Sequence, residues 1–334
     1  MSTGFHVAIV GATGAVGAEL IQLLEQREFP LEGLKLLASS KSAGKALKFR
    51  GEEIPVETLS HHSFKAVDIA LFSAGASISR EYARQAIADG AIVIDNSSAF
   101  RMEPEVPLVV PEINSSDIRQ HRGIISNPNC TTIIALMALY PLHVTFGLKR
   151  VIAASYQAVS GAGAKAIREL SLQSKAFFSG EPAAPEVFPH AIAFNVMPQV
   201  DVFLDNGYTK EEVKFVNESR KIMHHPALRA SITCVRVPVF RAHSVALNAE
   251  FEQPVSVERA HDVLAKFQGL ELVDDPGSKR YPTPLLAAGK NNCQVGRIRA
   301  DSALDNGLAF WVCGDQLLKG AALNALQIAE ALGK

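Results

Sequence analysis

The sequence lacks three features: an excess of charge of one sign, a long apolar run, and a dense set of cysteines. Its 33 Lys and Arg residues nearly balance 34 Asp and Glu residues, leaving a formal net charge of −1. Such a balance provides no basic field that would attract nucleic acid. The longest apolar run contains Pro141 and ends at His143, and at about ten residues it is too short to span a bilayer. We therefore expect neither a nucleic-acid partner nor a membrane.

The four cysteines are scattered along the chain and do not resemble the framework of a small disulfide-stabilised domain. An apolar, strand-like segment begins at Phe5, which leaves no room for a secretory signal peptide. We therefore expect a protein of the reducing cytoplasm. Cys234, Cys293 and Cys313 have apolar, strand-like neighbours and are expected to lie in the core.

What the sequence does have is a globular composition and an alternating pattern of elements. Apolar residues make up 48% and charged residues 20% of the 334 positions, which suits about two soluble domains and excludes disordered and fibrous classes. Strand-like segments at residues 5–10, 34–38, 68–72, 91–95 and 123–126 alternate with helical stretches at residues 18–26, 77–88 and 115–121. This alternation predicts an α/β fold with a Rossmann-like, doubly wound parallel sheet.

The pattern changes after residue 129. Longer strands are predicted at residues 150–159, 231–239, 244–251, 294–300 and 308–313, and these favour a second α+β domain with a mixed or antiparallel sheet. A helix predicted at residues 316–332 has apolar positions at helical spacing and is expected to pack back on the first domain. The predicted domains are residues 1–129 with 316–334, and residues 130–315.

A glycine-rich loop joins the first predicted strand to the first predicted helix. Residues 11–17 read Gly-Ala-Thr-Gly-Ala-Val-Gly. Glycines allow a sharp turn and close backbone approach, and the helix start presents N–H groups to a pyrophosphate. The spacing of Gly11, Gly14 and Gly17 departs from the usual dinucleotide-binding pattern, and such a turn also serves plain packing, but its position in a strand–helix unit favours a phosphate cradle.

The loop after the second predicted strand indicates which dinucleotide the chain would bind. Residues 39–45 read Ser-Ser-Lys-Ser-Ala-Gly-Lys, without the Asp or Glu that would bind a ribose 2′-hydroxyl. Hydroxyls and a lysine can accept a 2′-phosphate that a carboxylate would repel. The loop therefore predicts NADP, with a solvated basic turn as the alternative interpretation.

Cys130 lies in a turn that suits a reactive thiol. Residues 126–132 read Ser-Asn-Pro-Asn-Cys-Thr-Thr. Pro128 disfavours a helical conformation at Asn127, and Asn129 or a flanking Thr can cap a helix that begins near Cys130. The positive end of that helix would stabilise a thiolate and lower the pKa of the thiol. Cys130 is the predicted nucleophile, and a small buried hydrophobe at a helix start is the alternative.

Other polar residues are weak signals taken singly. Gln157 ends a predicted strand, where an amide can orient a carbonyl, although a lone Gln is more often structural. Arg236 lies in an apolar strand, and a buried guanidinium needs an anion. His243 shares strand parity with apolar residues, so a core histidine is the ordinary interpretation unless a thiol lies beside it. Arg101 follows a strand's carboxyl end, where open α/β sheets place ligands.

Glu218 and Lys221 lie three residues apart on a predicted helix opened by a capping box at Thr209 and Glu212. A pair with this spacing is usually a solvated surface pair of little energetic weight. A functional role for the pair therefore needs support from elsewhere in the chain.

Taken together, these motifs resemble those of aspartate-semialdehyde dehydrogenases over nearly the whole chain. The motifs that carry the resemblance are residues 95–101, 126–132 and 155–158, Glu218 with Lys221, and residues 234–236 and 242–244. Two positions depart from the family pattern: Lys41 stands where arginine is frequent, and Ala76 replaces a usual glycine. Both concern the affinity for the cofactor.

The resemblance implies reversible, NADPH-dependent reduction of β-aspartyl phosphate to aspartate semialdehyde and phosphate, a step in the biosynthesis of lysine, methionine, threonine and diaminopimelate. Cys130 would form a thioester with the substrate, and His243 would act as general acid and base. Arg101 and Lys221 would hold the phosphate, and Arg236 the substrate carboxylate. The remaining implied contacts are Glu218 to the ammonium, and Gln157 and Asn129 to the acyl group.

The resemblance also implies the cofactor contacts, no metal, and a homodimer or dimer of dimers. The implied cofactor residues are Gly11, Thr13, Gly14, Ala15, Val16, Ser39, Lys41, Ser42, Ser73, Ala74, Gly75, Ser160 and Gly161.

Three other functions remain open. Glyceraldehyde-3-phosphate dehydrogenases share Cys-Thr-Thr and thioester chemistry, but residues 39–41 do not suit their NAD. N-acetyl-γ-glutamyl-phosphate reductases have a glycine before the cysteine, and their acylated substrate would give Glu218 no charge to meet. A catalytically silent NADP-binding paralogue would keep the fold but lose the thiol or the histidine, and both are present here.

Overall fold

The computed structural model describes residues 4–333. The chain divides into two compact units, residues 1–129 with 321–334 and residues 130–320. Among the described residues, no helix is long and apolar enough to cross a membrane.

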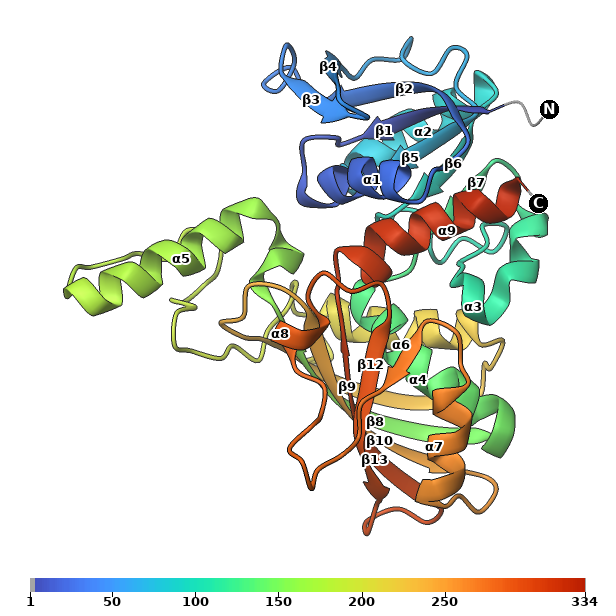
Figure 1. Cartoon of the computed structure of the whole chain (residues 1–334), viewed down its shortest axis with the longest axis vertical. Helices are drawn as coiled ribbons and strands as arrows, with labels where there is room; N and C mark the ends of the chain where they lie inside the picture. The colour runs from blue at the N-terminus through green and yellow to red at the C-terminus, as the bar shows by residue number, and fades with distance from the viewer. Residues whose placement is uncertain (1–3, 334) are drawn as a thin grey trace. The chain divides into compact units, whose positions relative to one another are not determined.

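The first unit is built on a seven-stranded sheet with the order β3-β4-β2-β1-β5-β6-β7 (Figure 1). Its strands are β1 (Phe5–Val10), β2 (Leu31–Ala38), β3 (Ala46–Phe49), β4 (Glu52–Thr58), β5 (Ile69–Phe72), β6 (Ile92–Asp95) and β7 (Ile124–Ser126). Strand β1 pairs in parallel with β2 and β5, and the parallel pairing continues through β6 to β7. The predicted doubly wound sheet is confirmed. Its central strands are almost continuously apolar because helices cover both faces.

The hairpin of β3 and β4 is absent from the sequence prediction. The two strands are antiparallel, and β4 joins the main sheet beside β2. Lysines and glutamates alternate with apolar residues here, and the turn uses Arg50 and Gly51 at positive φ. Alternation of polar and apolar residues over so short and polar a segment is a weak strand signal. Pairing with the neighbouring strand decides whether such a segment forms a strand.

The helices of the first unit are α1 (Ala15–Gln26), α2 (Ala76–Ala88), α3 (Pro111–Asn114), the 3₁₀ segment η1 (Ser115–Gln120) and α9 (Leu323–Leu332). The helix expected at residues 316–332 begins later, because a π-helical segment, η3 (Leu318–Ala322), precedes α9. Helix α9 contacts α1 and β6, and Arg27, the residue after α1, forms an ion pair with Glu330. The C-terminal helix thus packs on the first unit.

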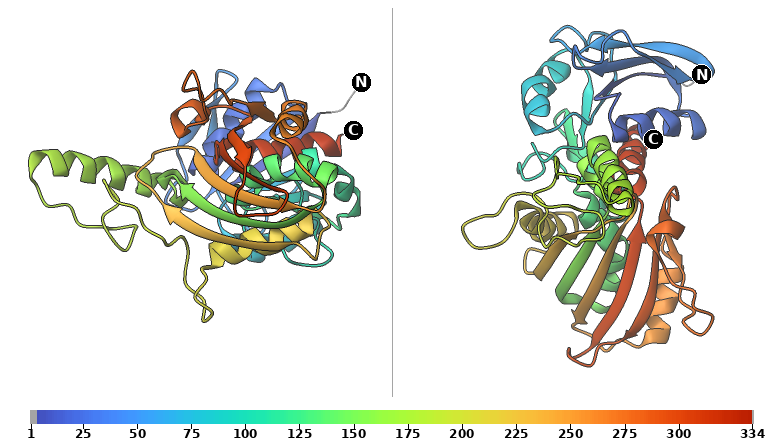
Figure 2. Two further views of the ribbon diagram at one scale, coloured as in Figure 1. Left: turned by 90° about the horizontal axis from the view of Figure 1, so that it is seen from below. Right: turned by 90° about the vertical axis from the view of Figure 1, so that its left-hand side faces the viewer.

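The second unit is built on a six-stranded sheet with the order β11-β12-β13-β10-β8-β9 (Figure 2). Its strands are β8 (Leu148–Gln157), β9 (Arg229–Arg236), β10 (His243–Phe251), β11 (Leu270–Leu272), β12 (Cys293–Ala300) and β13 (Gly307–Gly314). Strands β8 and β9 are parallel, whereas β10 is antiparallel to both β8 and β13. The sheet is therefore mixed, as predicted.

The helices of the second unit are α4 (Cys130–Phe146), η2 (Val159–Ala162), α5 (Ala164–Ser179), α6 (Lys210–Ile222), α7 (Val257–Ala265) and α8 (Pro284–Ala287). Helices α4, α6 and α7 pack on one face of the sheet, and α5 projects away from it (Figures 1 and 2). Helix α4 is apolar around almost its whole circumference and is buried accordingly. Cys130 is its first residue, as the sequence predicts.

Candidate active site

Cys130 is the accessible thiol of the four. It is partly exposed at the start of α4, whereas Cys234, Cys293 and Cys313 are buried. Burial raises the pKa of Cys234, and it raises the pKa of Cys313 to about 11. A thiol with a raised pKa is a poor nucleophile near neutral pH. The core positions predicted for the three other cysteines are confirmed, and Cys130 alone combines access with a helix start.

Arg236 is the buried cation of the second unit's site. It ends β9, is 6% exposed, and its Nη1 donates to the carbonyl oxygen of Ala158 at 2.6 Å. Burial lowers the pKa of Arg236, an effect opposed by the charges of Glu211 and Cys130. The guanidinium therefore lies within electrostatic reach of both an acidic side chain and the thiol.

His243 and Arg236 converge on the turn after β8. The backbone N–H of Ala158 donates to His243 Nδ1 at 3.0 Å, so one residue holds both side chains. A Cβ atom added to Gly161 would lie 3.1 Å from His243 Cε1 and 3.2 Å from Arg236 Nη1. Gly161 thus lies next to both side chains, and a larger residue at this position would crowd them.

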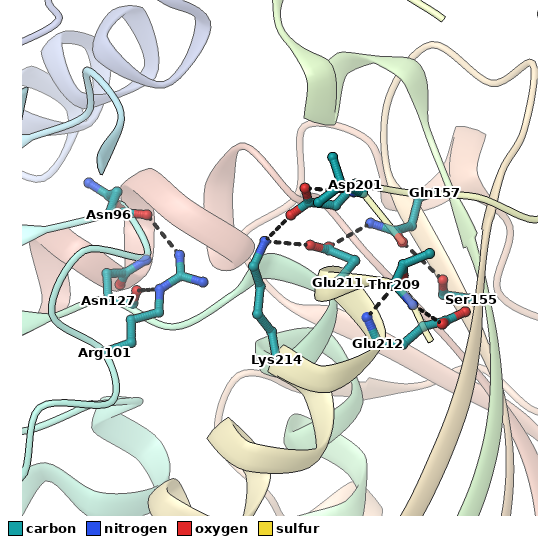
Figure 3. A network of polar contacts seen from close by, with 11 residues as sticks. Asn96, Arg101, Asn127, Ser155, Gln157, Asp201, Thr209, Glu211, Glu212 and Lys214 are labelled. Carbon is teal, nitrogen blue, oxygen red and sulfur yellow. Dashed lines mark hydrogen bonds and ion pairs between the residues drawn. The ribbon is translucent and has the colours of Figure 1, made fainter. Parts of the chain in front are cut away.

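Gln157 belongs to a polar network at the carboxyl end of β8 (Figure 3). Its amide Nε2 donates to Glu211 at 3.1 Å, and Lys214 forms ion pairs with Glu211 at 3.1 Å and Asp201 at 2.8 Å. Burial alone would lower the pKa of Lys214, but the charge of Glu211 and the bond to Asp201 outweigh it, and the pKa is raised. Lys214 therefore carries its positive charge at neutral pH.

The first turn of α6 supplies this network because the helix starts beside the strand end. Thr209 and Glu212 form the predicted capping box, with the Thr209 side chain accepting from the Glu212 backbone and the Glu212 carboxylate accepting from the Thr209 N–H. Glu212 also accepts from the backbone N–H of Cys234 at 3.0 Å, which ties the helix start to β9. The cap fixes where the neighbouring Glu211 points.

A cleft of about 540 Å³ opens at the carboxyl ends of the first unit's parallel strands. It is lined by Val10, Gly11, Thr13, Gly14, Ala38, Ser39, Ser40, Thr58, Leu59, Ser73, Ala74, Ile78 and Tyr82. Gly11 has φ +92°, and a Cβ there would lie 2.5 Å from the Ser73 carbonyl oxygen. The loops after β1 and β5 therefore approach each other closely here, and any other residue type at position 11 would clash with Ser73.

Arg101 is buried in the first unit beside the residues that lead to Cys130. Its Nε donates to the carbonyl oxygen of Asn127 at 2.9 Å and its Nη2 to that of Asn96 at 2.8 Å (Figure 3). Asn324 of α9 donates to the Asn127 side chain at 2.6 Å. Asn129, 6% exposed, directly precedes Cys130. The backbone before the thiol is thus held by several buried polar contacts.

Comparison with known proteins shows to which family this architecture belongs. Residues 6–121 match the family model "Semialdehyde dehydrogenase, NAD binding domain" and residues 139–319 match "Semialdehyde dehydrogenase, dimerisation domain". The aspartate-semialdehyde dehydrogenase of Aquifex aeolicus (strain VF5) is 51% identical over 335 residues, covering 99% of this chain and 98% of that protein. That of Bacillus subtilis (strain 168) is 49% identical and covers 100% of this chain and 99% of that protein. The chain belongs to the aspartate-semialdehyde dehydrogenase family.

A solved relative extends the likeness to the whole backbone. Aspartate semialdehyde dehydrogenase II of Vibrio cholerae, whose crystal structure is described as complexed with ASA, superposes with a TM-score of 0.97 at 45% identity. The match covers 99% of this chain and 98% of that one. Family membership establishes an aspartate-semialdehyde dehydrogenase with a nicotinamide-cofactor domain and weighs against the other functions left open by the sequence.

In this family member, the predicted cofactor residues differ in whether they line the cleft and in the unit to which they belong. Gly11, Thr13, Gly14, Ser39, Ser73 and Ala74 line the cleft. Ala15, Val16, Lys41, Ser42 and Gly75 are their neighbours in the same unit, where Thr13 donates to Ser42 at 3.3 Å and Gly75 caps α2. Ser160 and Gly161 belong to the other unit, beside His243. The cleft residues Thr58 and Leu59 were missed because Thr58 ends, and Leu59 follows, the unpredicted strand β4.

A second Glu-x-x-Lys pair, which the sequence analysis did not single out, lies on the same helix. Gln157 donates to Glu211, and Lys214 pairs with Glu211 and Asp201, whereas Glu218 and Lys221 lie seven residues further along α6, roughly 10 Å by helix rise. Glu218 is 1% exposed. The roles given to Glu218 and Lys221 stay predictions.

Proposed function

We propose that the chain catalyses the reversible, NADPH-dependent reductive dephosphorylation of L-aspartyl 4-phosphate to L-aspartate 4-semialdehyde through a thioester on Cys130. The observation that carries this proposal is the accessible Cys130 thiol, which interacts electrostatically with the buried Arg236. A thiol that can ionise beside a cation is suited to attack an acyl phosphate. The Vibrio cholerae relative described as complexed with ASA supports the same substrate.

The polar residues match the charges of that substrate. Arg236 presents a planar fork suited to a carboxylate, and Gln157 an amide suited to the acyl carbonyl. Glu218 supplies a carboxylate for the ammonium, and Lys221 a cation for a phosphate, as the family resemblance implies. Arg101 in the first unit is a second buried guanidinium for phosphate. A zwitterion that also carries phosphate needs charge pairing of this kind.

The cleft fits NADP by its chemistry. Ser39 and Ser40 line it, Lys41 follows directly, and none of the residues described as lining it is acidic. Hydroxyls and a lysine suit a 2′-phosphate, and the α1 start after Gly14 suits the pyrophosphate. When bound, the cofactor supplies the hydride that reduces the thioester. Gly11 would hold it by close backbone approach.

The protein is inferred to work as a homodimer in the cytoplasm. Residues 139–319 match a dimerisation domain. The sheet face opposite α4, α6 and α7 exposes Ile152 and Tyr156, and the Tyr156 ring lies 5.1 Å from that of Trp311. An apolar strip on a sheet face is suited to a second copy of the chain.

One assay tests the proposed function. Purified enzyme is given aspartate semialdehyde, phosphate and NADP, and NADPH formation is followed by absorbance, with and without phosphate. We expect phosphate-dependent NADPH formation. In a parallel reaction, the N-acetylated five-carbon aldehyde should be a poor substrate, because it offers no ammonium. A preference for the acetylated aldehyde would transfer the chain to N-acetyl-γ-glutamyl-phosphate reduction and overturn the proposal.

A further inference from the structure

Asp95 is a fully buried carboxylate at the end of β6, and the proposed reaction does not use it. The Ser79 hydroxyl donates to its Oδ1 at 2.7 Å, and the Ser97 N–H donates to the same oxygen at 3.0 Å. The Ser97 hydroxyl donates to Oδ2 at 2.7 Å. A buried carboxylate destabilises a fold unless donors satisfy it, and these three contacts do so. The carboxylate is therefore fixed in place, and so are the groups that bond to it.

Arg101, to which the proposed function assigns the phosphate, is oriented by two backbone carbonyls. Its Nη2 donates to the Asn96 carbonyl at 2.8 Å and its Nε to the Asn127 carbonyl at 2.9 Å (Figure 3). A guanidinium is planar, so bonds at two of its nitrogens fix the plane and the directions in which the other N–H groups point. The direction from which Arg101 meets an anion therefore depends on these two carbonyls.

Asp95 holds the residues that carry both carbonyls. The Asn96 carbonyl and the Ser97 N–H belong to one planar peptide group, in which they point in opposite directions. Because the N–H bonds to Asp95, the carbonyl points away from Asp95, and there it accepts from Arg101. The backbone carbonyl of Asp95 in turn accepts from the Asn127 N–H at 2.8 Å. We propose that Asp95 is a positioning residue that orients Arg101 for the substrate phosphate, an inference that rests on the proposed function.

Helix α2 supports the same turn at two points. Ser79 on α2 donates to Asp95, and Arg80 donates to the Ala99 carbonyl at 3.1 Å. The Ser97 hydroxyl also accepts from the Ala99 N–H at 3.1 Å. The turn after β6 is thus held by Asp95 on one side and by α2 on the other, and Asp95 bonds to both.

A purely structural role for Asp95 is the alternative. In that case the loss of its carboxylate would lower the Tm, and the molecules that stay folded would bind phosphate as the wild type does. A positioning role instead predicts a weaker affinity for phosphate in molecules that are fully folded. The affinity for phosphate, measured well below the Tm, therefore separates the two roles.

The first test measures phosphate binding without turnover. The full chain, with NADP in excess so that the dinucleotide cleft is filled, is titrated calorimetrically with inorganic phosphate. We expect Asp95→Asn to raise the Kd for phosphate about five- to tenfold, because asparagine keeps one acceptor oxygen and replaces the other by an NH2 donor. Arg101→Lys should raise it at least as much, because lysine lacks the planar fork. A Kd within about twofold of the wild-type value in either variant would overturn the proposal.

The second test separates KM from kcat in the NADPH assay. Asp95→Asn should raise the KM for phosphate about five- to tenfold and leave the KM for NADP within about twofold of the wild-type value. A merely structural role would lower the rate through the folded fraction and leave both KM values unchanged. An unchanged KM for phosphate, or an equal rise in both KM values, would overturn the proposal.

A double-mutant cycle tests whether Asp95 acts through Ser97. Ser97→Ala removes the hydroxyl that bonds to Asp95 Oδ2. Since that contact can be lost only once, Asp95→Asn combined with Ser97→Ala should bind phosphate no more weakly than Ser97→Ala alone. Losses that multiply in the double variant would overturn the proposal. Ser97→Ala by itself provides the measurement if Asp95→Asn fails to fold, and wild-type phosphate affinity in it would also overturn the proposal.

Asp117→Asn is the matched control. Asp117 is also buried in the first unit, and it accepts from Asn114 Nδ2 at 2.8 Å. The same chemical change there should leave the Kd and the KM for phosphate at their wild-type values. The titration needs no turnover, so a chain that binds phosphate through Arg101 and forms no NADPH would overturn the proposed reaction and retain the role of Asp95.

Discussion

At the scale of single residues, the candidate site depends on buried charged side chains and on their hydrogen bonds and ion pairs. Arg236, Glu211 and Lys214 are each polar side chains taken largely out of water, and each is paired in the structure. Removing one partner from such a set leaves a buried charge unsatisfied, which costs more than an exposed pair would. Substitutions at these positions should therefore lower the stability of the folded protein.

Cys130→Ala should abolish turnover and leave the affinity for NADP nearly unchanged, because the thiol forms the proposed covalent bond and the nucleotide cleft lies among other residues. Turnover is measured by NADPH formation, and affinity by quenching of Trp311 fluorescence or by calorimetry. Cys313→Ala is the matched control: it removes a buried thiol, so it should lower stability and spare the reaction. Substantial turnover in Cys130→Ala would contradict the thioester mechanism.

Glu211→Gln and Glu218→Gln make the same chemical change two turns apart on α6. If Glu218 meets the substrate ammonium, Glu218→Gln should cost about 1 to 3 kcal/mol in kcat/KM. Glu211, which bonds to Gln157 and Lys214, should affect stability more than kcat/KM. Steady-state kinetics with aspartate semialdehyde and thermal unfolding separate the two effects. The opposite ranking in kcat/KM would move the ammonium-binding role to Glu211.

At the scale of elements, the ends of strands and the starts of helices place the chemistry. Gln157 and Arg236 end neighbouring parallel strands that pair with one another in register. Glu211 reaches Gln157 because the capping box starts α6 next to those strand ends. We therefore expect loops after strands to carry the specificity in both units.

The loop after β2 should set the choice of cofactor. Lys41→Asp replaces a cation that suits the 2′-phosphate by an anion that repels it, so the ratio of kcat/KM for NADP to that for NAD should fall by about tenfold or more. The two kcat/KM values come from steady-state assays with NADP and with NAD. Lys45→Asp makes the same charge change four residues further along the chain and is the control. Equal efficiencies with NADP and NAD in the wild type would show that the loop has been misinterpreted.

The pairing of β8 with β10 includes an ionic contact that should depend on pH. Glu250 lies opposite Arg150 in the register and bonds to Arg150 and, at 2.9 Å, to Lys149. The Arg150 and then the Lys149 hydrogen bonds lower the pKa of Glu250 from 4.5 to about 2. A carboxyl with a lowered folded-state pKa contributes stability above its unfolded pKa and loses it as the pH falls.

Glu250→Gln should therefore lower the Tm at neutral pH, and the difference from the wild type should shrink as the pH falls from 4.5 towards about 2. Thermal unfolding followed by circular dichroism at several pH values measures it. A Tm difference that stays constant over this range would mean that Glu250 acts through packing alone.

At the scale of the whole molecule, the uncovered sheet face predicts assembly. Ile152 is 52% exposed on β8, on the face that α4, α6 and α7 leave open. Ile152→Lys would place a charge in the proposed dimer interface and should shift the protein towards monomer in analytical ultracentrifugation. Lys149→Gln changes a charged residue of the same strand and serves as the control. An unchanged dimer in Ile152→Lys would place the interface elsewhere.

The sequence alone determined the class of fold and predicted the nucleophile. Cys130 could be proposed because turn chemistry and helix-start electrostatics are local, and they are visible over seven consecutive residues. The alternation of strands and helices predicted the parallel sheet for the same reason: periodicity is a property of each segment. The glycines of the first loop likewise predicted a binding turn, and in the structure this turn lines a cleft.

Only the tertiary structure decided which side chains meet in the polar network at the end of β8. Gln157 donates to Glu211, which lies 54 residues away along the chain, and the spacing of Glu211 and Lys214 equals that of Glu218 and Lys221. The orientation of His243 was also beyond the sequence, because its Nδ1 accepts from the Ala158 N–H, a backbone group that follows another strand's end. Contacts between residues distant along the chain depend on how strands pair and where helices begin, and local propensity does not encode that.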